Sequence, residues 1–95
     1  MANEQAGDPD AHVEVAVVTT SGRYPTQGTN RVAAHEPVSV ELAKAVKELK
    51  IVDTSGWVAR VNGQVIDPNK SYVDNHLTGT VIIDYGPPEG GGGNE

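Results

Sequence analysis

The sequence has no cysteine and no phenylalanine among its 95 residues, and aromatic residues make up only 4% of it. The absence of cysteine excludes disulfides, thiolate metal ligands and a thiol nucleophile within this chain. Any thiol chemistry must therefore come from a partner. A chain this short forms one domain at most and buries only about 60% of the surface that its unfolded form exposes. A deep catalytic cleft is therefore not expected.

Basic residues are also scarce. Seven lysines and arginines stand against thirteen acidic residues, which gives a net charge of -6. Nucleic acids and anionic membranes attract clustered basic side chains, and those of this chain are scattered, so neither is an expected partner. No stretch approaches the roughly 20 apolar residues of a membrane span. The N-terminus lacks the basic and apolar regions of a secretory signal, so we expect a cytoplasmic protein.

Composition divides the chain into three parts. Residues 1–11 are polar and acidic and are predicted to form a disordered leader. Residues 87–95 are rich in proline and glycine and are predicted to form a flexible tail. The intervening residues 12–86 carry the hydrophobic patterns of a single folded domain.

The first part of this domain is predicted to be a hairpin. Residues 12–18, "HVEVAVV", alternate with period 2, which is typical of a strand with one solvated face. Residues 19–30 are dense in turn-forming residues and read as a turn region. A short strand over residues 29–34 is then expected to pair with the first.

A helix is predicted next. Leu42, Val46 and Leu49 recur at helical spacing with Ala43 beside them, while charged residues fill the opposite face. Ser39 is a plausible N-cap for this helix.

The remaining elements again read as strands. Asn62-Gly63, between two apolar-rich arms, is a strong signal for a two-residue hairpin turn, although these residues leave open which face is buried. A turn-rich connection follows, with Tyr72 and Leu77 as apolar anchors. Residues 80–86, "TVIIDYG", form a β-branched final strand. This order predicts an α+β fold with one helix packed across a mixed sheet of four to five strands, and flexible termini.

Several stretches taken in this order resemble the β-grasp fold of ubiquitin and of the sulfur carriers of thiamin and molybdopterin synthesis. Tyr72, Asp74 and Leu77 occupy the positions of the family's "L-x-D-x-x-I" pattern. The closest similarity is to prokaryotic ubiquitin-like modifiers found with an activating enzyme, a conjugating enzyme and a JAB-type peptidase. The stretches that carry the resemblance are "VAVVTTSG", "HEPVSVELAKAV", "VARVNGQVI" and "KSYVDNHLTGTVIIDYG".

The resemblance implies a function for the tail, because Gly90, Gly91, Gly92 and Gly93 lie where the family keeps its diglycine. A peptidase would cut between Gly93 and Asn94, and an activating enzyme would adenylate the new terminus with its own ATP before conjugation to a target protein. Glycine has no Cβ and suits a narrow enzyme channel. The chain would then be a substrate and not an enzyme, without a cofactor, and we expect a monomer.

Other functions remain open. The chain could be a sulfur carrier that acts through a C-terminal thiocarboxylate, or a non-conjugated β-grasp module that binds proteins through a sheet face or edge. A glycine-rich terminus is also common in plain flexible linkers. No catalytic residue is assigned, because the serines, histidines and aspartates form no local signature. His12, His35 and His76 lie on different elements, so we assign no metal site.

Two sets of surface residues complete the candidates. The exposed hydrophobic patch of ubiquitin maps onto Thr20, Arg60 and Asp84, which makes this patch largely polar here. A candidate interaction surface consists of Arg60, Ile82 and Asp84. The candidate acceptors for chain building are Lys44, Lys47, Lys50 and Lys70. A solvated helix face explains these lysines more simply.

Overall fold

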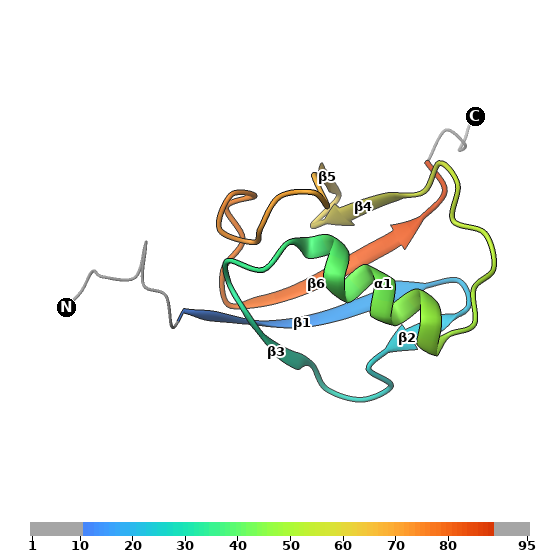
Figure 1. Ribbon diagram of the computed structural model, residues 1–95, viewed down its shortest axis with the longest axis horizontal. Coiled ribbons are helices and arrows are strands. Elements are labelled where there is room, and N and C mark those ends of the chain that lie inside the picture. The colour runs from blue at the N-terminus through green and yellow to red at the C-terminus, as the bar shows by residue number, and fades with distance from the viewer. Residues whose placement is uncertain (1–10, 89–95) are drawn as a thin grey trace.

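A computed structural model describes residues 11–88 of the chain, so the leader over residues 1–10 and the glycine-rich tail over residues 89–95 lie outside the described residues. Within residues 11–88, one helix and six strands follow one another (Figure 1). They are β1 (His12–Thr19), β2 (Gly22–Tyr24), β3 (Asn30–Ala33), α1 (Val38–Glu48), β4 (Val58–Val61), β5 (Gln64–Ile66) and β6 (Thr80–Gly86).

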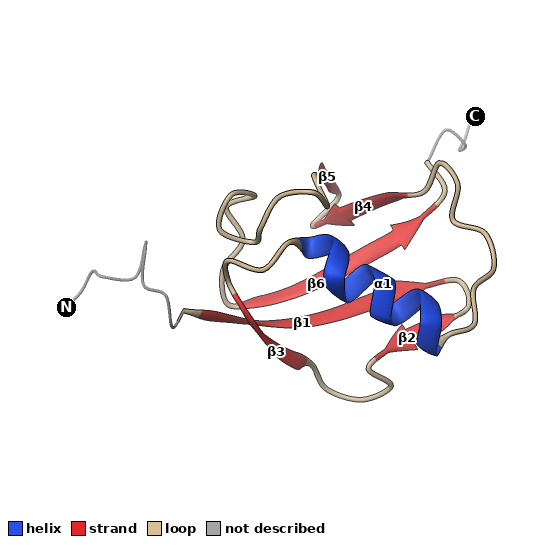
Figure 2. Cartoon of the chain, in the orientation of Figure 1, coloured by secondary structure: helices blue, strands red, loops and turns tan. Residues whose placement is uncertain are grey.

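The strands form one mixed sheet in the order β2-β1-β6-β4-β5, with β3 also paired to β1. The central strands β1 and β6 run parallel, with Val15 opposite Val81 and Val17 opposite Ile83. All the other strand pairs are antiparallel. Figure 2 shows α1 lying across one face of this sheet. The predicted α+β architecture is confirmed, with six strands where four to five were expected.

The additional strand, β2, lies inside the stretch that was predicted to be only a turn. The backbone turns sharply after Thr19, where Gly22 has a φ of 137°, a value that residues with a side chain rarely adopt. The Thr19 hydroxyl accepts a hydrogen bond from the Ser21 amide (2.9 Å) and donates one to the Gly22 carbonyl (3.0 Å). β2 then pairs with the second half of β1, while the predicted partner, β3, pairs with the first half.

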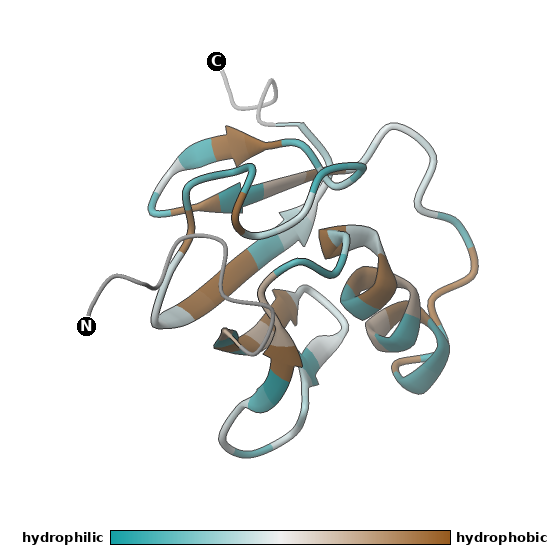
Figure 3. Ribbon diagram, turned by 60° about the vertical axis from the view of Figure 1, so that its left-hand side comes forward, coloured by the Kyte–Doolittle hydropathy of each residue, from teal (hydrophilic) through white to brown (hydrophobic). Residues whose placement is uncertain are grey.

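The core lies between α1 and the sheet. Figure 3 shows hydrophobic residues along the central strands and on the helix, and mostly hydrophilic residues on the loops. Ala16, expected on the solvated side of β1, is completely buried. β1 has neighbouring strands on both sides, and the register places Ile82 of β6 opposite Ala16. The core residues are Val13, Val15, Val17, Val32, Ala34, Val38, Leu42, Ala45, Ala59, Val61, Tyr72, Val81 and Ile83.

The helix begins one residue before the predicted cap. Pro37 occupies the N-cap position and makes no side-chain capping hydrogen bond, so the prediction of Ser39 as the cap is wrong. The first amides of the helix are instead satisfied by distant backbone carbonyls. The Val38 amide donates to Lys70 (3.0 Å), and the Ser39 amide donates to Pro68 (2.9 Å). A tertiary contact therefore replaces the local cap.

The buried stripe of α1 is rotated relative to the predicted one. Leu42 is buried as expected, but Ala43 is exposed and Ala45 is buried in its place. Val46 and Leu49 are only half-buried. The helix crosses the sheet at an angle, so its C-terminal turn leaves the core.

The second hairpin and the apolar anchors follow the prediction. Asn62 (φ 54°) and Gly63 (φ 83°) connect β4 to β5, as a tight two-residue turn requires. The face of β4 that carries Ala59 and Val61 is the buried one. Tyr72 is fully buried and is one of the largest side chains in the core.

Candidate functional site

The chain leaves the sheet at the end of β6. This strand lies between β1 and β4 and ends at Gly86, and the next two residues, Pro87 and Pro88, are exposed. The ring of Tyr85 contacts that of Trp57 edge-on, with centroids 5.1 Å apart and planes at 81°. The base of the tail is therefore attached to a paired, packed strand. The predicted conjugation and processing residues, Gly90, Gly91, Gly92, Gly93 and Asn94, lie outside the described residues.

The structure brings the three predicted surface residues onto one face of the sheet. Arg60 is directly opposite Asp84 in the pairing of β4 with β6, and Ile82 lies on the same side of β6. This is the outer face, away from α1, because the alternate residues Val81 and Ile83 point into the core. We call this the outer sheet face.

Exposed aliphatic side chains accompany the charged residues Arg60 and Asp84 on this face. Val18 is 36% exposed, Ile82 43% and Val65 62%. The strand register places Val18 opposite Asp84 and Val65 opposite Arg60. The row across the sheet is therefore Val18, Asp84, Arg60 and Val65, with one valine on each side of the charged pair, an arrangement that was not evident from any single strand.

All three arginines of the chain lie on the outer sheet face. Arg23 is opposite Val18, Arg31 is opposite Glu14, and Arg60 is opposite Asp84. Among the described residues no carboxylate forms an ion pair with any of them, since the only ion pair there joins Glu41 to Lys44. Planar guanidinium groups form bidentate hydrogen bonds with carboxylates, so this face offers donors to a partner.

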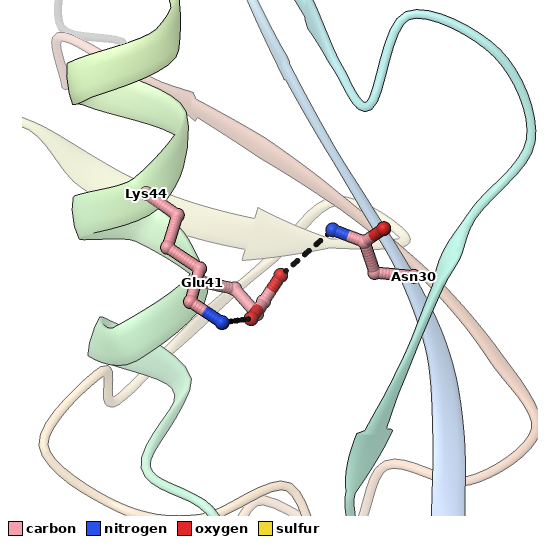
Figure 4. Close-up of polar contacts among 3 residues, drawn as sticks. All are labelled: Asn30, Glu41 and Lys44. Carbon is pink, nitrogen blue, oxygen red and sulfur yellow. Dashed lines mark hydrogen bonds and ion pairs between the residues drawn. The ribbon is translucent and has the colours of Figure 1, made fainter.

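The four candidate acceptor lysines are exposed and differ in their surroundings. The Lys44 amine lies 3.1 Å from Glu41 Oε2, while the side-chain amide of Asn30 donates to Glu41 Oε1 at 3.3 Å (Figure 4). Glu41 is only 1% exposed. Its hydrogen bond and its charge raise the pKa of Lys44 above the ordinary value. Among the described residues Lys47, Lys50 and Lys70 have no such partner.

Two further polar groups are buried near Glu41. One carboxylate oxygen of Glu36 and the hydroxyl of Tyr72 have no hydrogen-bond partner among the described residues. Burial raises the pKa of Glu36, the charge of Glu41 raises it further, and Lys44 opposes both effects. Burial also raises the pKa of Tyr72, with smaller contributions from Glu41 and Glu36. Tyr72 is therefore a neutral phenol at any physiological pH.

The described residues line a groove and a cavity on the surface. An open groove of about 380 Å³ runs along α1 beside Leu42, Val46, Trp57 and Tyr85. A second cavity, of about 510 Å³, is lined in part by His12 and His76.

Sequence spacing placed His12 and His76 on unrelated elements, and the fold brings them to one cavity while His35 stays apart. Within residues 11–88, no group of three or more histidine, aspartate and glutamate side chains is arranged to hold a metal ion. The described part of the chain also contains no helix of the length and hydrophobicity needed to cross a membrane.

Comparison with known proteins identifies the fold. No protein-family model and no curated protein matches the sequence. Among solved structures, a protein designed de novo on the basis of ubiquitin aligns with a TM-score of 0.59 at 23% identity, over 87% of this chain and 96% of that one. The ubiquitin-like domain of an Arabidopsis thaliana protein gives 0.56 at 15% identity, over 90% and 86%.

A third solved structure, the N-terminal ubiquitin-like domain in the 4931431F19Rik protein, aligns with a TM-score of 0.54 at 10% identity, over 100% of this chain and 95% of that one. Identities at this level support the fold alone. The similarity agrees with the helix packed on a mixed sheet that the strand register defines. The chain therefore has the ubiquitin-like β-grasp fold.

Proposed function

We propose that this chain is a prokaryotic ubiquitin-like protein modifier, which is trimmed after Gly93, adenylated and then joined to a target protein. The observation that carries the proposal is the exit of the chain from β6. This central strand ends at Gly86 beside the Trp57–Tyr85 contact, and Pro87 and Pro88 are exposed on leaving it. The four glycines follow within the next few residues of the sequence.

The proposed reaction needs no catalytic residue from the chain itself. After cleavage, the carboxylate of Gly93 attacks the α-phosphorus of ATP and pyrophosphate leaves, which yields an acyl adenylate. An amine of the target then attacks the acyl carbon, AMP leaves, and the amine loses a proton as the amide bond forms. Four consecutive residues without a Cβ let the walls of a narrow enzyme channel approach the backbone closely.

In this proposal the chain is a substrate in the cytoplasm, with no cofactor of its own. The activating enzyme uses ATP. Any thiol belongs to the activating and conjugating enzymes, since this chain has no cysteine. A JAB-type peptidase cleaves the bond after Gly93. Lys47, Lys50 and Lys70 are better acceptors for chain building than Lys44, whose amine is held by Glu41.

A second candidate function is a protein-binding module that is never conjugated. The observation in its favour is the outer sheet face, where Val18, Ile82 and Val65 are exposed among three arginines. Interfaces are enriched in arginine and combine such residues with apolar contacts. This candidate does not use the tail.

The first experiment tests cleavage. The full chain is incubated with a JAB-type peptidase from the same organism and its intact mass is measured. Loss of the residues after Gly93 is expected. Gly93→Val should block the cleavage because its side chain obstructs the channel, whereas Glu95→Gln, beyond the cut bond, should be processed like the wild type. An unchanged wild-type mass contradicts the proposed processing.

The second experiment tests conjugation. A chain that ends at Gly93 is incubated with the activating enzyme, the conjugating enzyme, ATP and a cell extract. Adducts of higher mass on a denaturing gel support a modifier. Replacement of one oxygen by sulfur in the intact mass would instead identify a sulfur carrier and overturn the proposal. If neither product forms and partner binding survives deletion of residues 87–95, the chain is a binding module.

A further inference from the structure

The cavity that contains His12 and His76 lies at the opposite end of the sheet from the tail. β1 and β6 run parallel (Figure 1). The cavity is lined by residues at the start of β1 and in the segment that precedes β6. Val13 and Ala34, both buried in the core, contribute to its walls. The half-buried Leu77 packs against the same core. The cavity is therefore built on the rigid part of the fold.

His76 has an unusual backbone conformation. Its φ of 61° lies in the left-handed region, which a residue with a side chain adopts at a cost. Two hydrogen bonds hold the turn around it: the His76 amide donates to the Val73 carbonyl (2.9 Å), and the Leu77 amide donates to the Tyr72 carbonyl (2.9 Å). Glycine or asparagine would relieve this strain. A strained residue held in place by its surroundings is typical of a functional position.

The size and chemistry of the cavity suit a small ligand. Its volume of about 510 Å³ is within the range of ligand sites, which are mostly apolar with a few polar groups that orient the ligand. Among the described residues, His12 and His76 are the only ionisable ones in its lining, and Thr78 adds a hydroxyl. Among residues 11–88 no carboxylate lines the cavity, and Asp74 in the same turn is not part of it. The polar groups that the structure describes there can therefore donate hydrogen bonds without a competing negative charge among them.

We propose that this cavity binds a small monocarboxylic acid with an aliphatic body. The carboxylate accepts hydrogen bonds from the imidazoles of His12 and His76, and the aliphatic part lies against Val13, Val73 and Leu77. Hydrogen bonds to an ionised carboxylate are stronger than those between neutral groups, so they select the acid over an alcohol of the same length. The site is independent of the tail and of the proposed conjugation.

The test on the wild-type full chain uses hexanoate as the probe and observes the imidazole proton resonances by NMR. Saturable shifts of His12 and His76 are expected, with His35, which lies outside the cavity, unchanged. 1-Hexanol should bind about tenfold more weakly, because it loses the charge-assisted hydrogen bonds. Equal binding of hexanol and hexanoate, or shifts that do not saturate, would overturn the proposal.

A pair of variants gives a second measurement. The double variant His12→Gln with His76→Asn removes both imidazoles, and asparagine tolerates the positive φ. It should bind hexanoate at least about tenfold more weakly, whereas the matched control His35→Gln should bind like the wild type. Undiminished binding by a folded double variant contradicts the proposal. If the double variant does not fold, the wild-type titration decides alone. Deletion of residues 87–95 should leave the affinity unchanged.

Discussion

The amine of Lys44 lies 3.1 Å from a carboxylate oxygen of Glu41, whose side chain is almost completely buried although Lys44 itself is on the surface. Glu41 is one turn earlier on the same helix, and its other oxygen is bound by Asn30 at the start of β3. The buried carboxylate of Glu41 thus connects α1 to β3 at the sheet edge. It also distinguishes Lys44 chemically from the other lysines.

We predict that Lys44 is the slowest lysine to be acylated. Only the unprotonated amine is nucleophilic, and the hydrogen bond and charge of Glu41 raise the pKa of Lys44. Limited treatment with N-hydroxysuccinimidyl acetate, followed by peptide mass spectrometry, should show faster modification of Lys47, Lys50 and Lys70. Glu41→Gln should remove the difference. Equal rates for Lys44 and Lys47 in the wild-type chain would show that the contact does not persist in solution.

We predict that ionisation of Glu36 lowers the free energy of unfolding as the pH rises. Burial, with the nearby charge of Glu41, raises its pKa above the ordinary value of 4.5. Between 4.5 and this higher folded pKa, the folded state binds more protons than the unfolded state. The contribution of Glu36 to stability is therefore fully present below 4.5 and is lost as the pH rises through the folded pKa.

Urea unfolding of Glu36→Gln tests this sign. At neutral pH the variant should be more stable than the wild type, because it has no charge to desolvate, and this advantage should shrink below pH 4.5. Glu48→Gln, which changes an exposed carboxylate on α1, serves as the control for net charge. A stability advantage of Glu36→Gln that does not change with pH would show that ionisation of Glu36 is not its cause.

We predict that Tyr72→Phe is neutral or stabilising. The Tyr72 hydroxyl is buried without a hydrogen-bond partner among the described residues, and such a group costs about 1–3 kcal/mol of desolvation. Removing it leaves the packing of the ring intact. Tyr72→Ala should instead cost about 3–5 kcal/mol, through the cavity that it creates. Thermal and urea unfolding measure both changes. Destabilisation of more than about 1 kcal/mol by Tyr72→Phe would mean that the hydroxyl has a partner, such as an ordered water.

The elements that the sequence predicts correctly are those with a strong local signal. Period-2 alternation located β1, β-branched residues located β6, and Asn62-Gly63 located the turn between β4 and β5. The elements that it missed depend on distant partners. β2 has only three residues and exists because it pairs with β1, and the start of α1 is fixed by carbonyls of Pro68 and Lys70.

The candidate sites also divide into features with a local signal in the sequence and features that depend on distant partners. Arg60, Ile82 and Asp84 were predicted to form one surface, but only the register between strands shows that all three arginines share its face. Similarly, His12 and His76 line one cavity only because the fold places the segment before β6 near the start of β1. The buried position of Glu41 was also hidden, because a glutamate in the first turn of a helix is ordinarily exposed.

We predict that Trp57 and Tyr85 stabilise the end of β6 as a coupled pair. Their edge-on geometry is the favourable one for aromatic rings, and such pairs contribute about 0.5–1.5 kcal/mol beyond their buried area. A double-mutant cycle with Trp57→Leu and Tyr85→Leu, measured by urea unfolding, should give a coupling energy in this range. Tyr85→Phe keeps the ring and should preserve the coupling with Trp57.

The same pair links stability to the tail, because Tyr85 directly precedes Gly86, where β6 ends. In Tyr85→Leu the last residues of β6 should lose protection from amide hydrogen exchange, while Val81 and Ile83 in the middle of the strand keep it. Additive single-mutant effects, together with unchanged exchange at the end of β6, would show that the ring contact does not hold the base of the tail. The exit of the chain would then depend on the pairing between β4 and β6 alone.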